Sequence, residues 1–338
     1  MRQSTAILAD TGVRLADLNF PANRVHIHRT RLAFIHLDNV LHFAKIDRDG
    51  RVDGYVTAYL PDEVAVLLMR RGEVITAVAF TESGREVIPI ATALRRMQQE
   101  TERGELVYAD APAQQLAWMY QSCAAPARSR FVDPNHPEQL FPALKHEEFT
   151  GVLEIISRGC VNYLRFENGD YVNSHLWGNI ADTSVSRQVQ GLFAPDSDGT
   201  LPQLAATVFP ATDELPAQAS PALIETYREL FWQLVNTAEK EMPGESLKRA
   251  IRLRDEVAQE HHSLKAIGTP ADRPVPDLVA TPEEITAALA AWTHKILEQL
   301  EVIAPGVAPE VLKGATREHR FVLQRAGFYE ALPWTVSW

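Results

Sequence analysis

The pattern of hydrophobic and polar positions predicts two three-stranded antiparallel meanders in the first two thirds of the chain. Each contains three apolar runs separated by polar turns. The runs cover residues 55–60, 64–69 and 74–80 in the first copy and 152–156, 161–166 and 171–177 in the second. Asn168-Gly169 before the last run favours a tight hairpin, because such a turn needs positive φ at both residues.

The two meanders align without a gap at an offset of 97 residues, which indicates an internal repeat. Residues 54–80 overlie residues 151–177 with four identities in 27 positions. One identity places Gly72 over Gly169 in the last turn. We therefore expect both segments to adopt the same fold, with these two glycines in equivalent turns.

Flanking segments extend each copy by a helix before the meander and by a helix and a strand after it. The leading helices are expected at 39–46 and 137–145, the second helices at 88–97 and 184–193, and the final strands at 104–109 and 203–209. The leading helices align if the first copy has a two-residue insertion.

From Ser220 onward the pattern becomes helical, after a connector rich in Pro and Ala at 210–219. Four helices are expected. They run from Ser220 to Pro243-Gly244, from Leu247 to about Ala266, from a capping box at Thr281 to Pro305-Gly306, and from Pro309 to Arg325. Two helical hairpins, as in a four-helix bundle, would result.

The predicted fold class is thus α+β, with two repeated helix-plus-meander units followed by an all-α helical-hairpin domain. The expected boundaries are an N-terminal segment at 1–24, a first α+β unit at 25–130, a second at 131–216 and the helical domain at 217–338.

The second copy carries the motifs Phe149-Thr150-Gly151-Val152-Leu153-Glu154-Ile155 and Tyr163-Leu164-Arg165-Phe166-Glu167-Asn168-Gly169-Asp170. With the helix before them, they make residues 138–177 similar to the bacterial PATAN domain, and the internal repeat would extend this resemblance to residues 39–80. Asn173-Ser174-His175 departs from the small residue usual in that family, and no receiver domain is visible. The resemblance implies a non-catalytic interaction module in bacterial signalling or surface-motility control.

The charge and composition of the chain disfavour several kinds of binding partner and exclude several kinds of site. The chain has 338 residues and a net charge of −11, which disfavours nucleic acid and anionic lipid as partners. Its two cysteines exclude a disulfide-stapled fold and a four-cysteine zinc site. Residues 1–22 lack the apolar core of a signal peptide, and no run is apolar enough to insert in a membrane. We expect a cytoplasmic protein.

No motif predicts a catalytic residue, a metal site or a cofactor. Residues 47–53 resemble a calcium loop, but Arg51 and Val52 occupy positions that need an oxygen ligand and glycine. The histidines at 26, 28, 36 and 42 lack a carboxylate or cysteine at ligand spacing, and neither Cys123 nor Cys160 has a local base. A hydrolase using His175 is the weakest hypothesis.

Candidate partner-binding residues are instead Arg70, Arg71, Trp232, Trp334 and Trp338. The two arginines occupy a hairpin tip where the second copy has Glu167-Asn168. Trp232 lies off the apolar stripe of its helix, and the two terminal tryptophans must pack either on the molecule or on a partner.

The leading functional hypothesis is a non-catalytic adaptor that binds another protein or a second copy of itself. The alternative is a small-molecule sensor with a pocket between the α+β units or in the helical domain.

Overall fold

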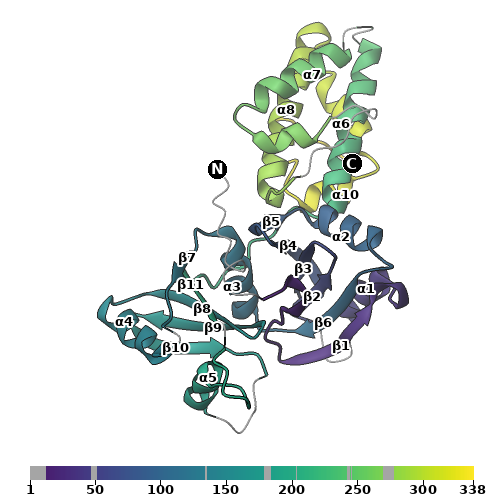
Figure 1. The fold of residues 1–338 in the computed structure, drawn as a ribbon. Helices are drawn as coiled ribbons and strands as arrows, with labels where there is room; N and C mark the ends of the chain where they lie inside the picture. The colour runs from purple at the N-terminus through teal and green to yellow at the C-terminus, as the bar shows by residue number, and fades with distance from the viewer. Residues whose placement is uncertain are drawn as a thin grey trace. The chain divides into compact units, whose positions relative to one another are not determined.

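The computed structural model describes residues 13–46, 52–133, 135–178, 184–202, 204–241, 244, 246–268 and 278–338. The chain divides into two compact units, Met1–Pro216 and Ala217–Trp338. The first is built on two antiparallel sheets and the second is helical (Figure 1). The predicted mixture of helices and antiparallel sheets is confirmed.

The first sheet has the strand order β1-β6-β2-β3-β4-β5. Its strands are β1 (Arg24–Arg31), β2 (Gly54–Tyr59), β3 (Glu63–Arg70), β4 (Glu73–Thr81), β5 (Gly84–Ile88) and β6 (Glu105–Asp110). Helix α1 (Leu37–Ile46) precedes the β2-β3-β4 meander, and α2 (Ile90–Gln99) follows β5.

The second sheet has the order β10-β9-β8-β11-β7. Its strands are β7 (Arg128–Arg130), β8 (Gly151–Ser157), β9 (Cys160–Glu167), β10 (Asp170–His175) and β11 (Leu204–Phe209), with helices α4 (Leu140–His146) and α5 (Val185–Phe193). Helix α3 (Ala113–Ala124) connects the two sheets along the chain. Strand β6 lies between β1 and the β2-β3-β4 meander in the first sheet. Strand β11 lies between β7 and the β8-β9-β10 meander in the second.

Strand β5 was not predicted from the sequence. The sequence predicts Ile88 in the second helix, because it continues the helical spacing of the residues after it. In the structure Ile88 ends β5, and α2 begins only at Ile90. Pro89 explains the boundary, because a residue that precedes proline is disfavoured in the α conformation.

The two meanders share the geometry of their last turn. Gly72 and Gly169 have φ values of +75° and +79°, and Arg71 and Asn168 before them also have positive φ. The turn lies against the leading helix in both cases. A Cβ on Gly72 would lie 2.4 Å from the carbonyl oxygen of Ala44, and one on Gly169 would lie 2.6 Å from the Cα of Lys145.

Three apolar clusters hold the first unit together. One lies between the first sheet and helices α1 and α2, and another lies between the second sheet and helices α4 and α5. The third joins the opposite faces of the two sheets and includes α3. Its large members include Phe20, Tyr55, Phe80, Trp118 and Tyr163. Both sheets are therefore covered on two faces.

The described part of the N-terminal segment belongs to this shared core. A short 3₁₀ helix, Leu15–Asp17, leads to the buried side chains of Leu18 and Phe20. Asn19 makes a parallel bridge with Cys160, and its backbone N–H donates to the carbonyl of Gly159 at 2.8 Å.

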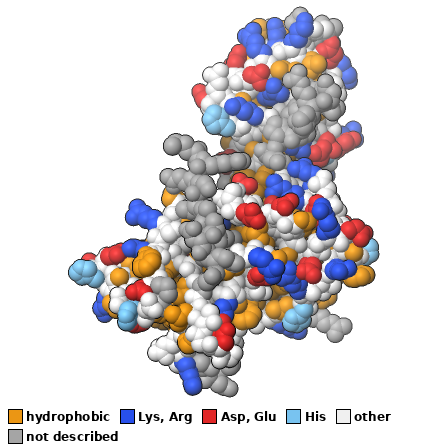
Figure 2. Space-filling view, viewed as in Figure 1, with side chains coloured by type: hydrophobic (Ala, Val, Ile, Leu, Met, Phe, Trp, Pro, Cys, Tyr) orange, Lys and Arg blue, Asp and Glu red, His pale blue; other side chains and the backbone are white. Residues whose placement is uncertain are grey.

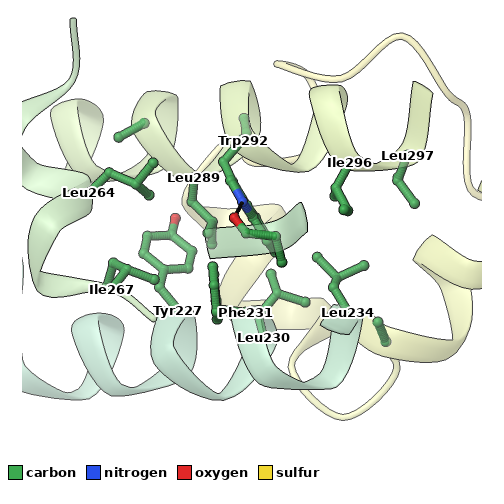
Figure 3. Close-up of a cluster of buried hydrophobic side chains, with 14 of the residues drawn as sticks. Tyr227, Leu230, Phe231, Leu234, Leu264, Ile267, Leu289, Trp292, Ile296 and Leu297 are labelled. Carbon is green, nitrogen blue, oxygen red and sulfur yellow. Dashed lines mark hydrogen bonds between the residues drawn. The ribbon is translucent and has the colours of Figure 1, made fainter. Parts of the chain in front are cut away.

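The helical unit contains α6 (Pro221–Glu241), α7 (Ser246–Val257), α8 (Pro282–Ile303), α9 (Ala308–Thr316), α10 (Arg320–Arg325) and a 3₁₀ helix, His262–Ala266. Phe231 stacks on Trp292 in its core, with ring centroids 4.3 Å apart (Figure 3). The Trp292 indole N–H donates to the carbonyl of Ala250 at 3.0 Å. The predicted capping box at Thr281 and Glu284 is present.

Two helix predictions in this unit are wrong. The second helix ends at Val257 instead of about Ala266, because Gln259, Glu260 and His261 offer no apolar side chain to bury. The fourth is broken into α9 and α10, and the chain after the break buries Leu323 and Phe328 completely. No helix in the described ranges is long and apolar enough to cross a bilayer.

Replacing either turn glycine with alanine should destabilise the protein by about 2 kcal/mol or more, because the side chain meets both positive φ and the helix backbone. Gly199→Ala is the matched control. Gly199 has φ of +83° but open space around it, so only the conformational cost of about 1 kcal/mol should appear. Urea unfolding of Gly72→Ala, Gly169→Ala and Gly199→Ala measures the difference. Equal losses in all three would contradict the close approach.

Candidate functional site

An apolar groove of about 620 Å³ lies on the helix-covered side of the second sheet. Strand β9 supplies Leu164 and Phe166, which are almost fully buried, and α5 supplies Val189 and Phe193. The remaining lining comes from Glu138, Phe141, Pro142, Lys145, Gly169, Tyr171, Val185, Ser186 and Gln190. Hydrophobic side chains gather on the surface around α4 and β10 (Figure 2).

Four aromatic rings from four elements shape this groove. The Phe166 centroid lies 6.3 Å from those of both Phe141 and Tyr171, and Phe141 lies 6.0 Å from Phe193. The Phe141–Phe193 and Phe166–Tyr171 pairs meet edge to face, the arrangement favoured by ring quadrupoles.

The charged side chains at the groove have partners nearby. The Lys145 ammonium lies 3.0 Å from the Asp170 carboxylate. The Glu138 carboxylate lies 3.3 Å from Nδ1 of His136. Both pairs are exposed, so neither directs a strong field into the groove.

A second feature is a row of polar residues between the two sheets, of which Glu154, Tyr163 and Thr207 are buried. His175, Tyr163, Glu154 and Thr207 stand directly opposite one another across β10, β9, β8 and β11. Directly opposite residues in antiparallel strands point to the same face. This face is turned toward the first sheet, because His175 packs on Trp118 of the shared core with ring centroids 5.0 Å apart.

Arg85 of β5 reaches this row from the first sheet. Its two terminal nitrogens donate to the Glu154 carboxylate at 2.8 and 2.7 Å. The side chains are only 5% and 1% exposed. The sequence analysis missed this pair, although one signal for it exists, since Glu154 is the single charged residue in the apolar run 152–156.

Burial shifts the pKa values of three other titratable groups on this side of the second sheet. Burial raises the pKa of the Cys123 thiol to about 12, so the thiol remains protonated. Burial also raises the pKa of Tyr163 well above its usual value. Burial lowers the pKa of His175 to about 4, which makes its ring a weak base.

The predicted partner-binding residues fall in different places. Arg70 and Arg71 are exposed at the tip of the β3-β4 hairpin in the first unit. In the helical unit, Trp232 and Trp334 are half-buried and pack against the apolar core. Trp338 is 49% exposed and its ring lies 6.1 Å from Tyr329, so the C-terminal residues do pack on their own unit.

An exposed aromatic surface surrounds Trp338. The Arg320 guanidinium lies 4.3 Å from the ring centroid of Phe321 and 5.7 Å from that of Trp338. Phe321 is 69% exposed. Sequence analysis did not select Phe321, because it opens the apolar run Phe321-Val322-Leu323, and three consecutive apolar residues do not show which of them faces the core.

The structure shows what surrounds some of the side chains considered as metal ligands. His26 does have a carboxylate partner, since its Nε2 lies 2.5 Å from Oδ1 of Asp110. Within the described ranges, no three His, Cys, Asp or Glu side chains gather as metal ligands would. Most of the calcium-loop-like segment at 47–53 lies outside the described residues.

Comparison with known proteins gives no relative for this chain. No family model, curated protein or solved structure matches it. The resemblance to the PATAN domain therefore stays a prediction.

Removing one partner of the buried ion pair should cost about 3–5 kcal/mol of unfolding free energy, because it strands a buried charge. We expect this for Arg85→Met and for Glu154→Leu, with much of the loss recovered in the double variant. Lys45→Met is the control, since the Lys45–Glu73 pair is about half exposed and should cost under about 1 kcal/mol. Additive losses in the double variant, measured by urea unfolding, would argue against the pairing.

His175 should make the protein less stable in acid. Its pKa of about 4 lies below the value of about 6.5 in an unfolded chain. As pH falls from about 7 toward 4, the unfolded state therefore binds a proton that the folded state does not, and stability is lost. The His175→Val variant should lose less unfolding free energy than wild type between about pH 7 and 5. The exposed His28→Val serves as control, and an identical pH dependence in all three proteins would refute the assignment.

Proposed function

We propose that this chain is a non-catalytic adaptor protein in which two fused PATAN-like units form a scaffold and the helical unit binds a protein partner. The proposal includes a bacterial signalling or surface-motility role, which rests on the PATAN resemblance, and a cytoplasmic location, which rests on the composition of the sequence. The partner is another protein or a second copy of the chain.

Matching strand order supports the fused repeat. The order β1-β6-β2-β3-β4 in the first sheet corresponds to β7-β11-β8-β9-β10 in the second, and β5 is an addition at one edge. The equivalent face of each meander enters the shared core, as with Tyr55 and Val152, or Val66 and Tyr163. Each of these pairs is separated by 97 residues.

Matching hydrogen bonds at the last turn give further support. The Gly72 N–H donates to the carbonyl of Val52 at 2.7 Å, and Gly169 donates to Phe149 at 2.8 Å. The preceding backbone N–H donates to a side chain in both copies: Arg71 to Asp53 at 2.5 Å and Asn168 to Thr150 at 2.9 Å. All four pairs keep the 97-residue offset.

The leading helices also correspond, at a different offset. Lys45 pairs with Glu73 at 2.8 Å, and Lys145 pairs with Asp170 at 3.0 Å. These contacts indicate that the first copy has three more residues than the second between the leading helix and the meander. The sequence alignment predicts two more.

The contacts of Cys123 and His175 support a non-catalytic role for the chain. Cys123 is partly buried near Arg85 and Glu154, and its raised pKa keeps the thiol protonated. His175, the group considered for a hydrolase, packs on Trp118, and its Nε2 has no hydrogen-bond partner among the described residues. A general base needs both a suitable pKa and access to the reacting proton.

The observation that carries the interaction proposal is the surface formed by Arg320, Phe321 and Trp338. Large exposed aromatic rings are unfavourable in water, and Trp, Tyr and Arg are the residue types most enriched in interface hot spots. The Arg320 guanidinium over both rings holds them in place, which lowers the entropy cost of binding.

Phe321→Ala and Trp338→Ala should each weaken partner binding by about tenfold or more, which corresponds to about 1.4 kcal/mol. The test is capture of partners by the tagged full chain from its native cells, quantified by mass spectrometry. Val302→Ala, at an apolar position 83% exposed in the same unit, is the control and should keep the captured proteins. Thermal melting of all variants accompanies the test.

The proposal fails if no captured protein is lost from both variants and kept by the control. It also fails if Phe321→Ala and Trp338→Ala melt far below wild type, because these side chains would then stabilise the fold.

A further inference from the structure

We infer that the groove on the second sheet is a binding site for a neutral, largely apolar small molecule. This site goes beyond the proposed adaptor function, since it lies in the other unit and does not depend on a protein partner. It also differs in place from the pocket expected between the α+β units or within the helical domain.

The first reason to place a ligand in this groove is a comparison of the two sheets. In the first sheet, α2 buries Ile90, Ala93 and Met97 in the apolar cluster against β3 and β4. In the second, α5 buries no residue completely, and its Val189 and Phe193 line the groove. The helix after the meander thus packs into the apolar core in the first copy and borders the groove in the second.

The dimensions favour a small molecule. A volume of about 620 Å³ lies within the range of about 300–1,000 Å³ typical of ligand and cofactor pockets. Leu164 and Phe166 of the sheet line the bottom of the groove, where neighbouring side chains leave them 1% and 3% exposed.

The lining selects an apolar ligand with planar or branched hydrocarbon groups. Aromatic rings from α4, β9, β10 and α5 contact one another around the recess, leaving ring faces and edges for a ligand to pack against. Ser186 and Gln190, on one side of the groove, offer hydrogen-bonding groups that could orient a single polar substituent.

The charges favour a neutral ligand. Lys145 is already paired with Asp170, and Glu138 lies next to His136. A charged ligand would lose hydration in the recess, and the charged lining residues Lys145 and Glu138 are both largely exposed to solvent, which weakens any attraction that they exert. A neutral molecule carries no such penalty.

The probe for the test is N-phenyl-1-naphthylamine, a neutral aromatic compound whose fluorescence rises in apolar surroundings. The full chain should bind it saturably and melt at a higher temperature in its presence, because a ligand that binds only the folded state stabilises that state. Val189→Trp places a large ring in the groove and should lower the affinity about tenfold or more. Arg187→Trp puts the same side chain at an exposed position of the same helix and should bind the probe like wild type.

Phe321→Ala should also bind the probe normally, which separates this inference from the adaptor proposal. Near-ultraviolet circular dichroism establishes that each variant is folded. Equal probe binding by wild type and a folded Val189→Trp would overturn the inference, as would fluorescence that never saturates. If wild type is a dimer by sedimentation and Val189→Trp is a monomer, the groove holds a second copy and the inference is likewise wrong.

Discussion

The first unit depends on one constraint: the central strands of both sheets must be buried on two faces. Helices cover one face of each sheet, and the other faces meet in the shared core. Antiparallel sheets commonly leave one face in water and alternate polar with apolar residues. Strands β2 and β8 are instead buried along their whole length, which requires side chains that tolerate burial at every position.

This constraint explains which parts of the fold could be predicted from the sequence. Continuous apolar runs such as 64–69 indicate fully buried strands, and glycines at their ends mark the turns. Local geometry then fixes the details, since positive φ at Asn168 and Gly169 requires no distant contact. The capping box at Thr281 is predictable for the same reason, because both of its partners lie within one helical turn.

Features that depend on distant residues could not be predicted. Arg85 and Glu154 are 69 residues apart, and only packing of the two sheets brings them together. The groove arises from how closely α5 approaches its sheet, and the apolar pattern of that helix is compatible with either a filled or a hollow site. The break between α9 and α10 likewise depends on which side chains reach the tertiary core, since Leu323 and Phe328 are both completely buried after it.

The two sheets differ most in the row of residues that they present to each other. Val78, Val66, Thr57 and Val107 stand opposite one another in the first sheet. His175, Tyr163, Glu154 and Thr207 occupy the corresponding places in the second. Two copies of the second sheet packed face to face would bury two Glu154 carboxylates without a cation, which is strongly unfavourable.

Pairing with the first sheet removes that penalty, because β5 of that sheet carries Arg85, and no strand among the described residues takes the same place in the second sheet. The ion pair thus favours packing of the second sheet on the first sheet over packing on another copy of itself. Here the buried charges contribute to specificity more than to stability. We therefore expect the two fused units to pack as an asymmetric pair, in which the first sheet covers the apolar face of the second. The helix-covered face of the second sheet takes no part in that pairing, so its groove can be occupied without disturbing the contact between the sheets.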